Sequence, residues 1–196
     1  MAAIALDLPR RAAAISLLLL LAAAPCAAQR RMAMNIARPY LDDEIPTARG
    51  TLSVPGNVEI PDNLRSTVAA MLRHSPTFRR QCARIGRAAD LEVVVQRGLL
   101  AASAKEGAVT RMVRGTKGGI EADVLIDALG DTVLLIAHEF EHIIEQLDGV
   151  DLAAMAARSA TGVSARPDDG QYETERAAAA GRRVAQEVRD GQRREP

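Results

Sequence analysis

The run His138-Glu139-Phe140-Glu141-His142 constrains the fold of this chain more than any other feature. Two histidines four residues apart project from the same face of an α-helix, because each residue turns the helix by about 100°. The spacing H-E-x-x-H therefore places two imidazoles where they can share one metal ion. The glutamate between them stands beside the metal position, where it can act on a metal-bound water.

The residues around this motif are apolar on nearly every side, which predicts a central, buried helix. We expect the helix to begin at Asp131, whose side chain can cap it, and to run to about Leu147. Two buried neutral imidazoles without partners would be costly, and one metal ion would satisfy both. The plainer alternative, two core histidines bonded to backbone carbonyls, leaves Glu139 unexplained.

The N-terminal residues have the form of a signal peptide. Arg10-Arg11 precede an apolar run, 12–24, that is too short to span a membrane, and small residues permit cleavage before Gln29. We therefore predict that residues 1–28 are a signal peptide and that the protein is secreted or periplasmic. No stable membrane insertion is expected after cleavage; a retained lipid or helical anchor is the alternative.

The remaining chain is long enough for one domain with a single core. Residues 29–61 are rich in proline and charge and predict an extended or disordered lead-in. Residues 62–189 are expected to form the domain, and 190–196 a frayed tail. The sequence has 25 basic and 25 acidic residues, so nothing in its charge favours nucleic acid as a partner. Cys82 would be the one cysteine left after cleavage, which excludes an intrachain disulfide and predicts a buried thiol.

Hydrophobic periodicity predicts an α+β fold. Helical spacing of apolar residues predicts helices over 62–74, capped by Asp62, and over 76–86, capped by Ser75. Alternation of apolar and polar residues then predicts three strands, over 91–96, 108–114 and 121–127. Glycines at 115–119 predict a hairpin between the last two strands. We therefore expect a small, mainly antiparallel sheet, followed by the motif helix and one further helix.

A zinc ion held by the motif usually needs a third protein ligand, and three carboxylates downstream are candidates. Glu145 lies on the histidine face but further along the same helix, so we expect it to support a ligand or to be a surface charge. Asp148 would need a sharp turn at position 145, where a glycine is missing. Glu173 leads the apolar face of a helix predicted from Tyr172 to about Arg189, so we expect it to be the ligand. The alternative is that Glu173 is only a first-turn residue favoured by the helix dipole.

With His138, His142 and Glu173 as metal ligands, the chain resembles the gluzincin class of zinc metallopeptidases. The resemblance is strongest at the motif and is closest to the minimal members of the class. Gluzincins often carry an Asp four residues after the ligand Glu, which orients a ligand histidine; this chain has Ala177 there. We expect Glu145 to supply that support instead. The resemblance also implies that extended peptide pairs with the edge of the strand 121–127.

The function implied is that of an exported zinc metalloendopeptidase acting on peptide or protein substrates. Glu139 would be the catalytic general base toward a water activated by Zn²⁺. The main alternative is a zinc-binding envelope protein in which the metal is structural. The second alternative is a metal-free helical interaction domain. In that case, removing the His138 side chain would only weaken core packing.

Overall fold

The computed structural model describes residues 52–100, 107–115, 118–165 and 171–195. The predicted signal peptide and most of the predicted lead-in lie outside these residues. The described elements, in chain order, are β1 (Val58–Glu59), α2 (Asp62–His74), α3 (Pro76–Gly86), β2 (Leu91–Gly98), β3 (Ala108–Arg114), β4 (Ile120–Asp127), α4 (Thr132–Leu147), α5 (Leu152–Ala156), β5 (Val163–Ala165), β6 (Tyr172–Thr174) and α6 (Glu175–Arg194). They form a mixed α/β fold with one four-stranded sheet and a short hairpin of β5 and β6.

The four-stranded sheet has the order β1-β2-β4-β3. The prediction of a mainly antiparallel sheet is wrong, because β1–β2 and β2–β4 pair in parallel and the antiparallel pair is β3–β4. Alternation of side chains fixes which face of a strand is buried, but the connections fix its direction. Here α2 and α3 form the crossover between β1 and β2, and β4 inserts between β2 and β3.

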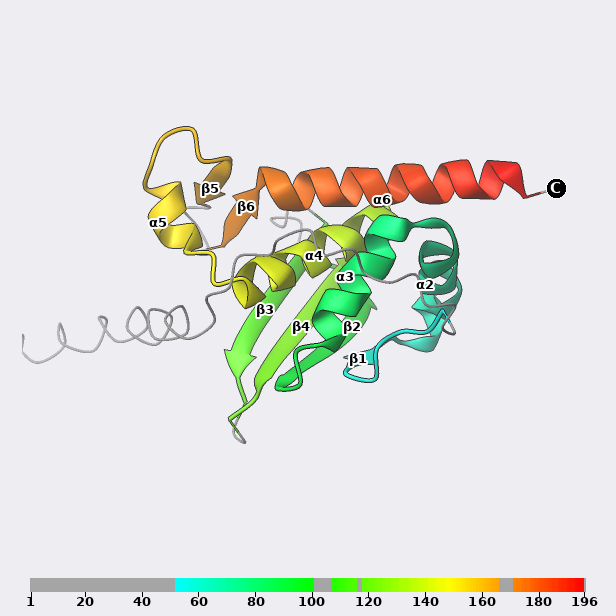
Figure 1. Ribbon diagram of the computed structural model, residues 1–196, viewed down its shortest axis with the longest axis horizontal. Coiled ribbons are helices and arrows are strands. Elements are labelled where there is room, and N and C mark those ends of the chain that lie inside the picture. Colours follow the sequence, from blue (N-terminus) through cyan, green and yellow to red (C-terminus); the bar gives the residue numbers. More distant parts are fainter. Residues whose placement is uncertain (1–51, 101–106, 116–117, 166–170, 196) are drawn as a thin grey trace, which may run out of the picture.

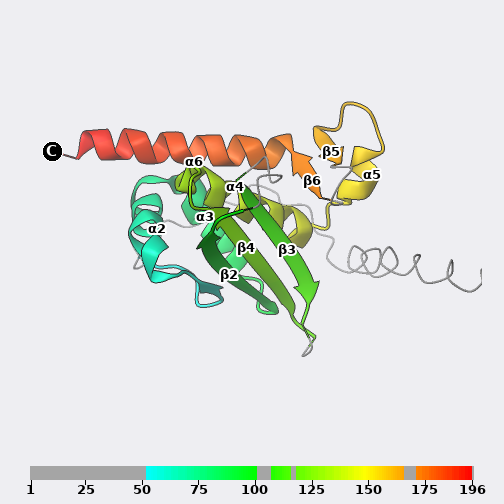
Figure 2. The ribbon, with the colours of Figure 1, turned by 180° about the vertical axis from the view of Figure 1, so that it is seen from behind.

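The helices cover one face of the sheet. Figure 1 shows α3 and α4 in front of the strands, and Figure 2 shows the opposite face of the sheet turned to the viewer. The alternation predicted this face: the side chains buried under the helices include Val93 and Val95 of β2 and Val124 and Ile126 of β4. The long helix α6 packs along α4 on the side away from the sheet.

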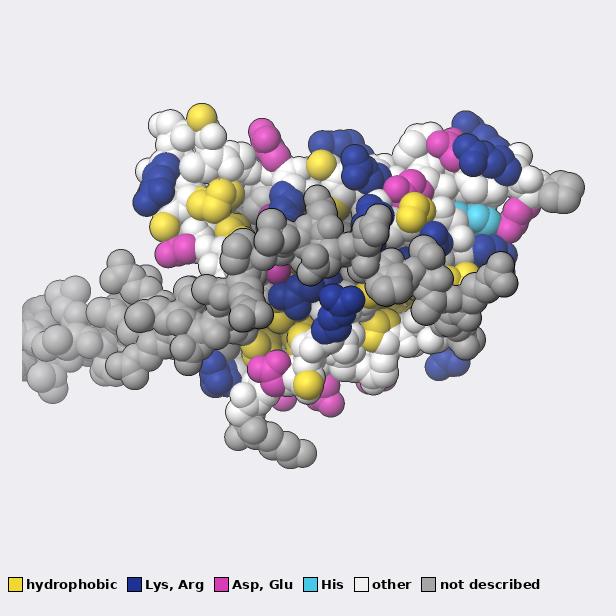
Figure 3. All heavy atoms as spheres, in the orientation of Figure 1, with side chains coloured by type: hydrophobic (Ala, Val, Ile, Leu, Met, Phe, Trp, Pro, Cys, Tyr) yellow, Lys and Arg dark blue, Asp and Glu magenta, His cyan; other side chains and the backbone are white. Residues whose placement is uncertain are grey.

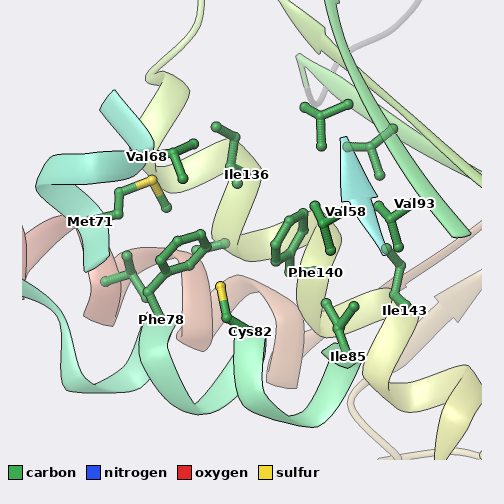
Figure 4. Packing of buried hydrophobic residues seen from close by; sticks show 14 of the residues in the cluster. Val58, Val68, Met71, Phe78, Cys82, Ile85, Val93, Ile136, Phe140 and Ile143 are labelled. Carbon is green, nitrogen blue, oxygen red and sulfur yellow. The ribbon is translucent and has the colours of Figure 1, made fainter. Parts of the chain in front are cut away.

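The core joins α2, α3 and α4 to the sheet (Figure 4). Phe78 of α3 stacks on Phe140 of α4 with ring centroids 5.5 Å apart, so these two aromatic rings fix the distance between their helices. Cys82 lies beside them, and burial raises the pKa of its thiol to about 12. The predicted buried, unreactive cysteine is thus confirmed.

Two of the three predicted N-cap residues agree with the structure. Asp131 caps α4 by accepting from the Leu134 amide, and Ser75 caps α3 by accepting from the Phe78 amide. The predicted cap of α2 by Asp62 is wrong. Pro61 occupies the cap position without a side-chain hydrogen bond, and Asp62 is the first helical residue.

Two predicted boundaries also change. β1 lies inside the predicted lead-in, where Asn57 donates hydrogen bonds to the carbonyls of Ile85, Ala88 and Leu91. The tail predicted to fray from residue 190 is helical to Arg194, and Glu195 forms ion pairs with the end of α2.

Basic side chains recur along the outer surface of α6 (Figure 3), so its polar face is solvated while its apolar face packs on α4. Within the described ranges, no helix is long and apolar enough to cross a membrane.

Candidate metal centre

Helix α4 carries His138, Glu139 and His142 in its buried middle section. The Nε2 atoms of His138 and His142 are 3.1 Å apart, and their rings meet edge to face. Ligand nitrogens of one tetrahedral zinc ion, each about 2.0–2.1 Å from the metal, would be about 3.3 Å apart. The two imidazoles therefore converge as ligands of one metal would.

Glu173 reaches the histidines from β6 and not from a helix. The prediction that the helix begins at Tyr172 is wrong, because residues 172–174 pair with β5, with Glu173 opposite Ser164. Glu173 Oε1 nevertheless lies 3.3 Å from His138 Nε2. One ligand atom each from His138, His142 and Glu173 lie within 4.8 Å of one another.

The group formed by His138, His142 and Glu173 can hold a metal ion, and the hydrogen bonding of Glu173 supports this. Glu173 Oε1 is buried and accepts no well-directed hydrogen bond within the described part of the chain. A buried carboxylate oxygen is rarely left in this state, and a cation between it and the two imidazoles would satisfy it. Burial alone would raise the pKa of Glu173, but the imidazoles of His138 and His142 outweigh it and hold the pKa below its ordinary value. The carboxylate is thereby kept ionised, as a metal ligand must be.

Glu139 is 3% exposed and faces β3. Thr110 of β3 donates a hydrogen bond of 2.5 Å to Glu139 Oε2. Burial raises the pKa of Glu139, although the Thr110 hydrogen bond and the two histidines partly counteract it. A raised pKa in a carboxylate beside a metal group is typical of a general base.

Glu145 is buried at 2% exposure and contacts the group from outside it. Its Oε2 lies 3.0 Å from His142 Nδ1, and its Oε1 accepts a hydrogen bond of 2.8 Å from the Thr174 hydroxyl. Burial alone would lower the pKa of His142, but the hydrogen bond to Glu145 and the surrounding carboxylates raise it. Of the two roles considered for Glu145, support of a ligand histidine fits this position and a surface charge does not.

Asp148 lies away from the three ligand atoms. It pairs with Arg84 of α3 and Arg176 of α6, each at 3.2 Å. Arg176 also donates to Glu141 at 2.6 Å, so one guanidinium ties the start of α6 to α4 close to Glu173. The third histidine, His74, is the last residue of α2 and is not part of this group. Its Nε2 lies 3.3 Å from Oε1 of Glu195, the residue that follows α6.

Sequence reasoning missed Thr110, Thr174 and Arg176. Thr110 belongs to no recognisable sequence motif. Only the pairing of β3 with β4 places it within hydrogen-bond distance of Glu139. Thr174 could have been found as a helix cap, since its hydroxyl accepts from the Ala177 amide, but the helix was predicted to start too early.

The strand expected to offer a free edge, β4, has none. It is paired on one side with β2 and on the other with β3. β3, the strand that carries Thr110, is an edge strand of the sheet and contacts α4. The expected docking of peptide on 121–127 is therefore wrong.

Comparison with protein-family models, with curated proteins and with solved structures gives no match to this chain. The geometry of the site therefore carries the functional argument.

Proposed function

We propose that the chain is an exported zinc metallopeptidase with a zincin-like, gluzincin-type site. The observation that carries the proposal is the convergence of His138, His142 and a buried oxygen of Glu173 that lies 3.3 Å from His138 Nε2, with Glu139 next to them. Two imidazoles and one carboxylate are the ligand set of a hydrolytic zinc ion, which keeps its fourth position for water.

Bound there, zinc would supply a Lewis acid that acidifies water and polarises a peptide carbonyl. Glu139 accepts the proton of the attacking water and passes it to the leaving amine, while His138, His142 and Glu173 stay deprotonated at their ligand atoms. Thr110 holds Glu139 in place through the 2.5 Å hydrogen bond.

A substrate peptide fits best along β3. The edge of this strand offers unpaired backbone groups within the described sheet, and Thr110 places the same strand beside the general base. An extended peptide that added to this edge would pass close to Glu139. Side chains along β3 would then determine which peptide sequences the site accepts.

The test is cleavage of a peptide library by the zinc-loaded full chain, with Glu139→Gln as the paired variant. We expect cleavage by the wild type, its loss with a chelator, and a fall of about 10²–10⁴-fold in Glu139→Gln with zinc still bound. Zinc binding without any cleavage by the wild type would contradict the peptidase proposal and favour a structural zinc site.

A further inference from the structure

Glu145 is a buried carboxylate with two fixed neighbours. His142 Nδ1 lies 3.0 Å from one of its oxygens and Thr174 Oγ1 lies 2.8 Å from the other. An ionised carboxylate can only accept hydrogen bonds. Both neighbours must therefore donate their protons to Glu145.

The Thr174 hydroxyl has no freedom to turn elsewhere. Its oxygen accepts a hydrogen bond of 2.9 Å from the Ala177 amide, which makes it the N-cap of α6. Its single proton then points to Glu145. Thr174 is 3% exposed, so water does not compete for either bond.

The direction of these bonds determines the state of His142. With its proton on Nδ1, a neutral imidazole has its lone pair on Nε2. That Nε2 is the atom that faces His138, 3.1 Å away. The chain of bonds from Thr174 through Glu145 thus presents His142 in the one tautomer that can bind a metal at this position.

We propose that Thr174 is a positioning residue of the metal centre, which fixes the tautomer and direction of His142 through Glu145 and couples metal binding to the start of α6. The inference rests on the proposed metal site and deepens it. Glu145 approaches His142 from α4 itself, and Thr174 follows Glu173 directly in β6. One short strand then supplies both a metal ligand and the support of a second ligand.

The same chain contains a matched control. Ser75 also caps a helix, by accepting from the Phe78 amide at 2.9 Å, and also donates to a glutamate, Glu187, at 2.5 Å. It is buried like Thr174, and within the described residues its glutamate accepts hydrogen bonds from Ser75 and Thr77 instead of facing a histidine. Ser75→Ala therefore removes the same two bonds as Thr174→Val without touching the metal group.

The experiment compares the wild-type full chain with Thr174→Val, Thr174→Ser and Ser75→Ala. The first readout is the ¹⁵N spectrum of the imidazoles in metal-free protein, at a pH where histidine is neutral. The second is zinc affinity, measured by competition with a chromophoric chelator. The third is hydrogen exchange at the Ala177 amide with and without zinc.

We expect His142 to be protonated on Nδ1 in the wild type and in Thr174→Ser, and to become a mixture of tautomers in Thr174→Val. Zinc affinity should fall about tenfold in Thr174→Val, recover in Thr174→Ser and stay unchanged in Ser75→Ala. Zinc should slow exchange at Ala177 in the wild type.

The inference is overturned if His142 carries its proton on Nε2, or if Thr174→Val and Ser75→Ala have the same effect on zinc affinity. The tautomer is read without metal and without substrate. A chain that binds zinc and cleaves nothing, or one that binds no zinc, would contradict the proposed function while the spectrum still decides the role of Thr174.

Discussion

Gly181 of α6 lies directly against His138 of α4. A β-carbon at position 181 would come 3.3 Å from His138 Cβ and 2.8 Å from the Leu134 carbonyl oxygen. The absence of a side chain lets the two helices approach at the level of the metal group. The close crossing keeps Glu173, eight residues before Gly181, near the histidines of α4.

Gly181→Ala is expected to destabilise the protein. In an exposed helix interior this change would add about 1 kcal/mol of stability, but here the added methyl meets a backbone oxygen and costs about 1–3 kcal/mol. Chemical denaturation of the metal-free chain measures the effect, with the exposed neighbour Arg182→Ala as control. A stabilised Gly181→Ala variant would show that the helices are not closely packed here.

Removing the buried charge of Glu139 should stabilise the metal-free protein at neutral and alkaline pH. Burial raises the pKa of Glu139 in the folded state, so folding is opposed once the unfolded chain loses this proton. The protonated Glu139 carboxyl therefore makes its full contribution to stability below the ordinary glutamate pKa. That contribution is lost as the pH rises through the pKa that Glu139 has in the folded protein. We therefore expect Glu139→Gln to exceed the wild type in unfolding free energy at pH about 8, with the gap closing toward pH about 4. A gap that widens in acid would contradict this assignment.

Thr110 is expected to set the acid limb of activity. Its hydrogen bond lowers the pKa of Glu139, so Thr110→Val should raise that pKa further. A general base must be deprotonated, and the acid limb of kcat/KM should therefore move to higher pH. Thr110→Ser should restore the wild-type profile. An unchanged acid limb of kcat/KM in Thr110→Val would show that Thr110 does not influence the general base.

Zinc should raise the melting temperature in a concentration-dependent way. The group joins α4 to β6, and a ligand that binds only the folded state stabilises it by about 2.7 kcal/mol at 100 times its Kd. Differential scanning calorimetry with added zinc and then with a chelator checks this. Magnesium serves as control, because it prefers octahedral oxygen ligands.

The sequence was most informative where a local pattern decides the structure. The α4 helix, its Asp131 cap and the buried faces of β2 and β4 follow from periodicity and capping chemistry alone. The same holds for Ser75 at the start of α3.

Tertiary contacts decided the rest. Tyr172, Glu173 and Thr174 continue the helical pattern of α6, but pairing with β5 extends them into a strand. Glu173 therefore joins the histidines for a reason other than the helical periodicity that singled it out. The direction of β2 relative to β4, and with it the edge position of β3 and Thr110, depends on connections that alternation does not encode.

The most direct test of the account is the zinc content of the purified full chain by elemental analysis. Glu173→Ala is compared with Glu175→Ala, which removes the exposed carboxylate two residues further on. We predict one zinc per chain in the wild type and in Glu175→Ala, and its loss in Glu173→Ala. Absence of zinc from the wild type after incubation with the metal, or full zinc content in Glu173→Ala, would contradict the proposed His138–His142–Glu173 centre.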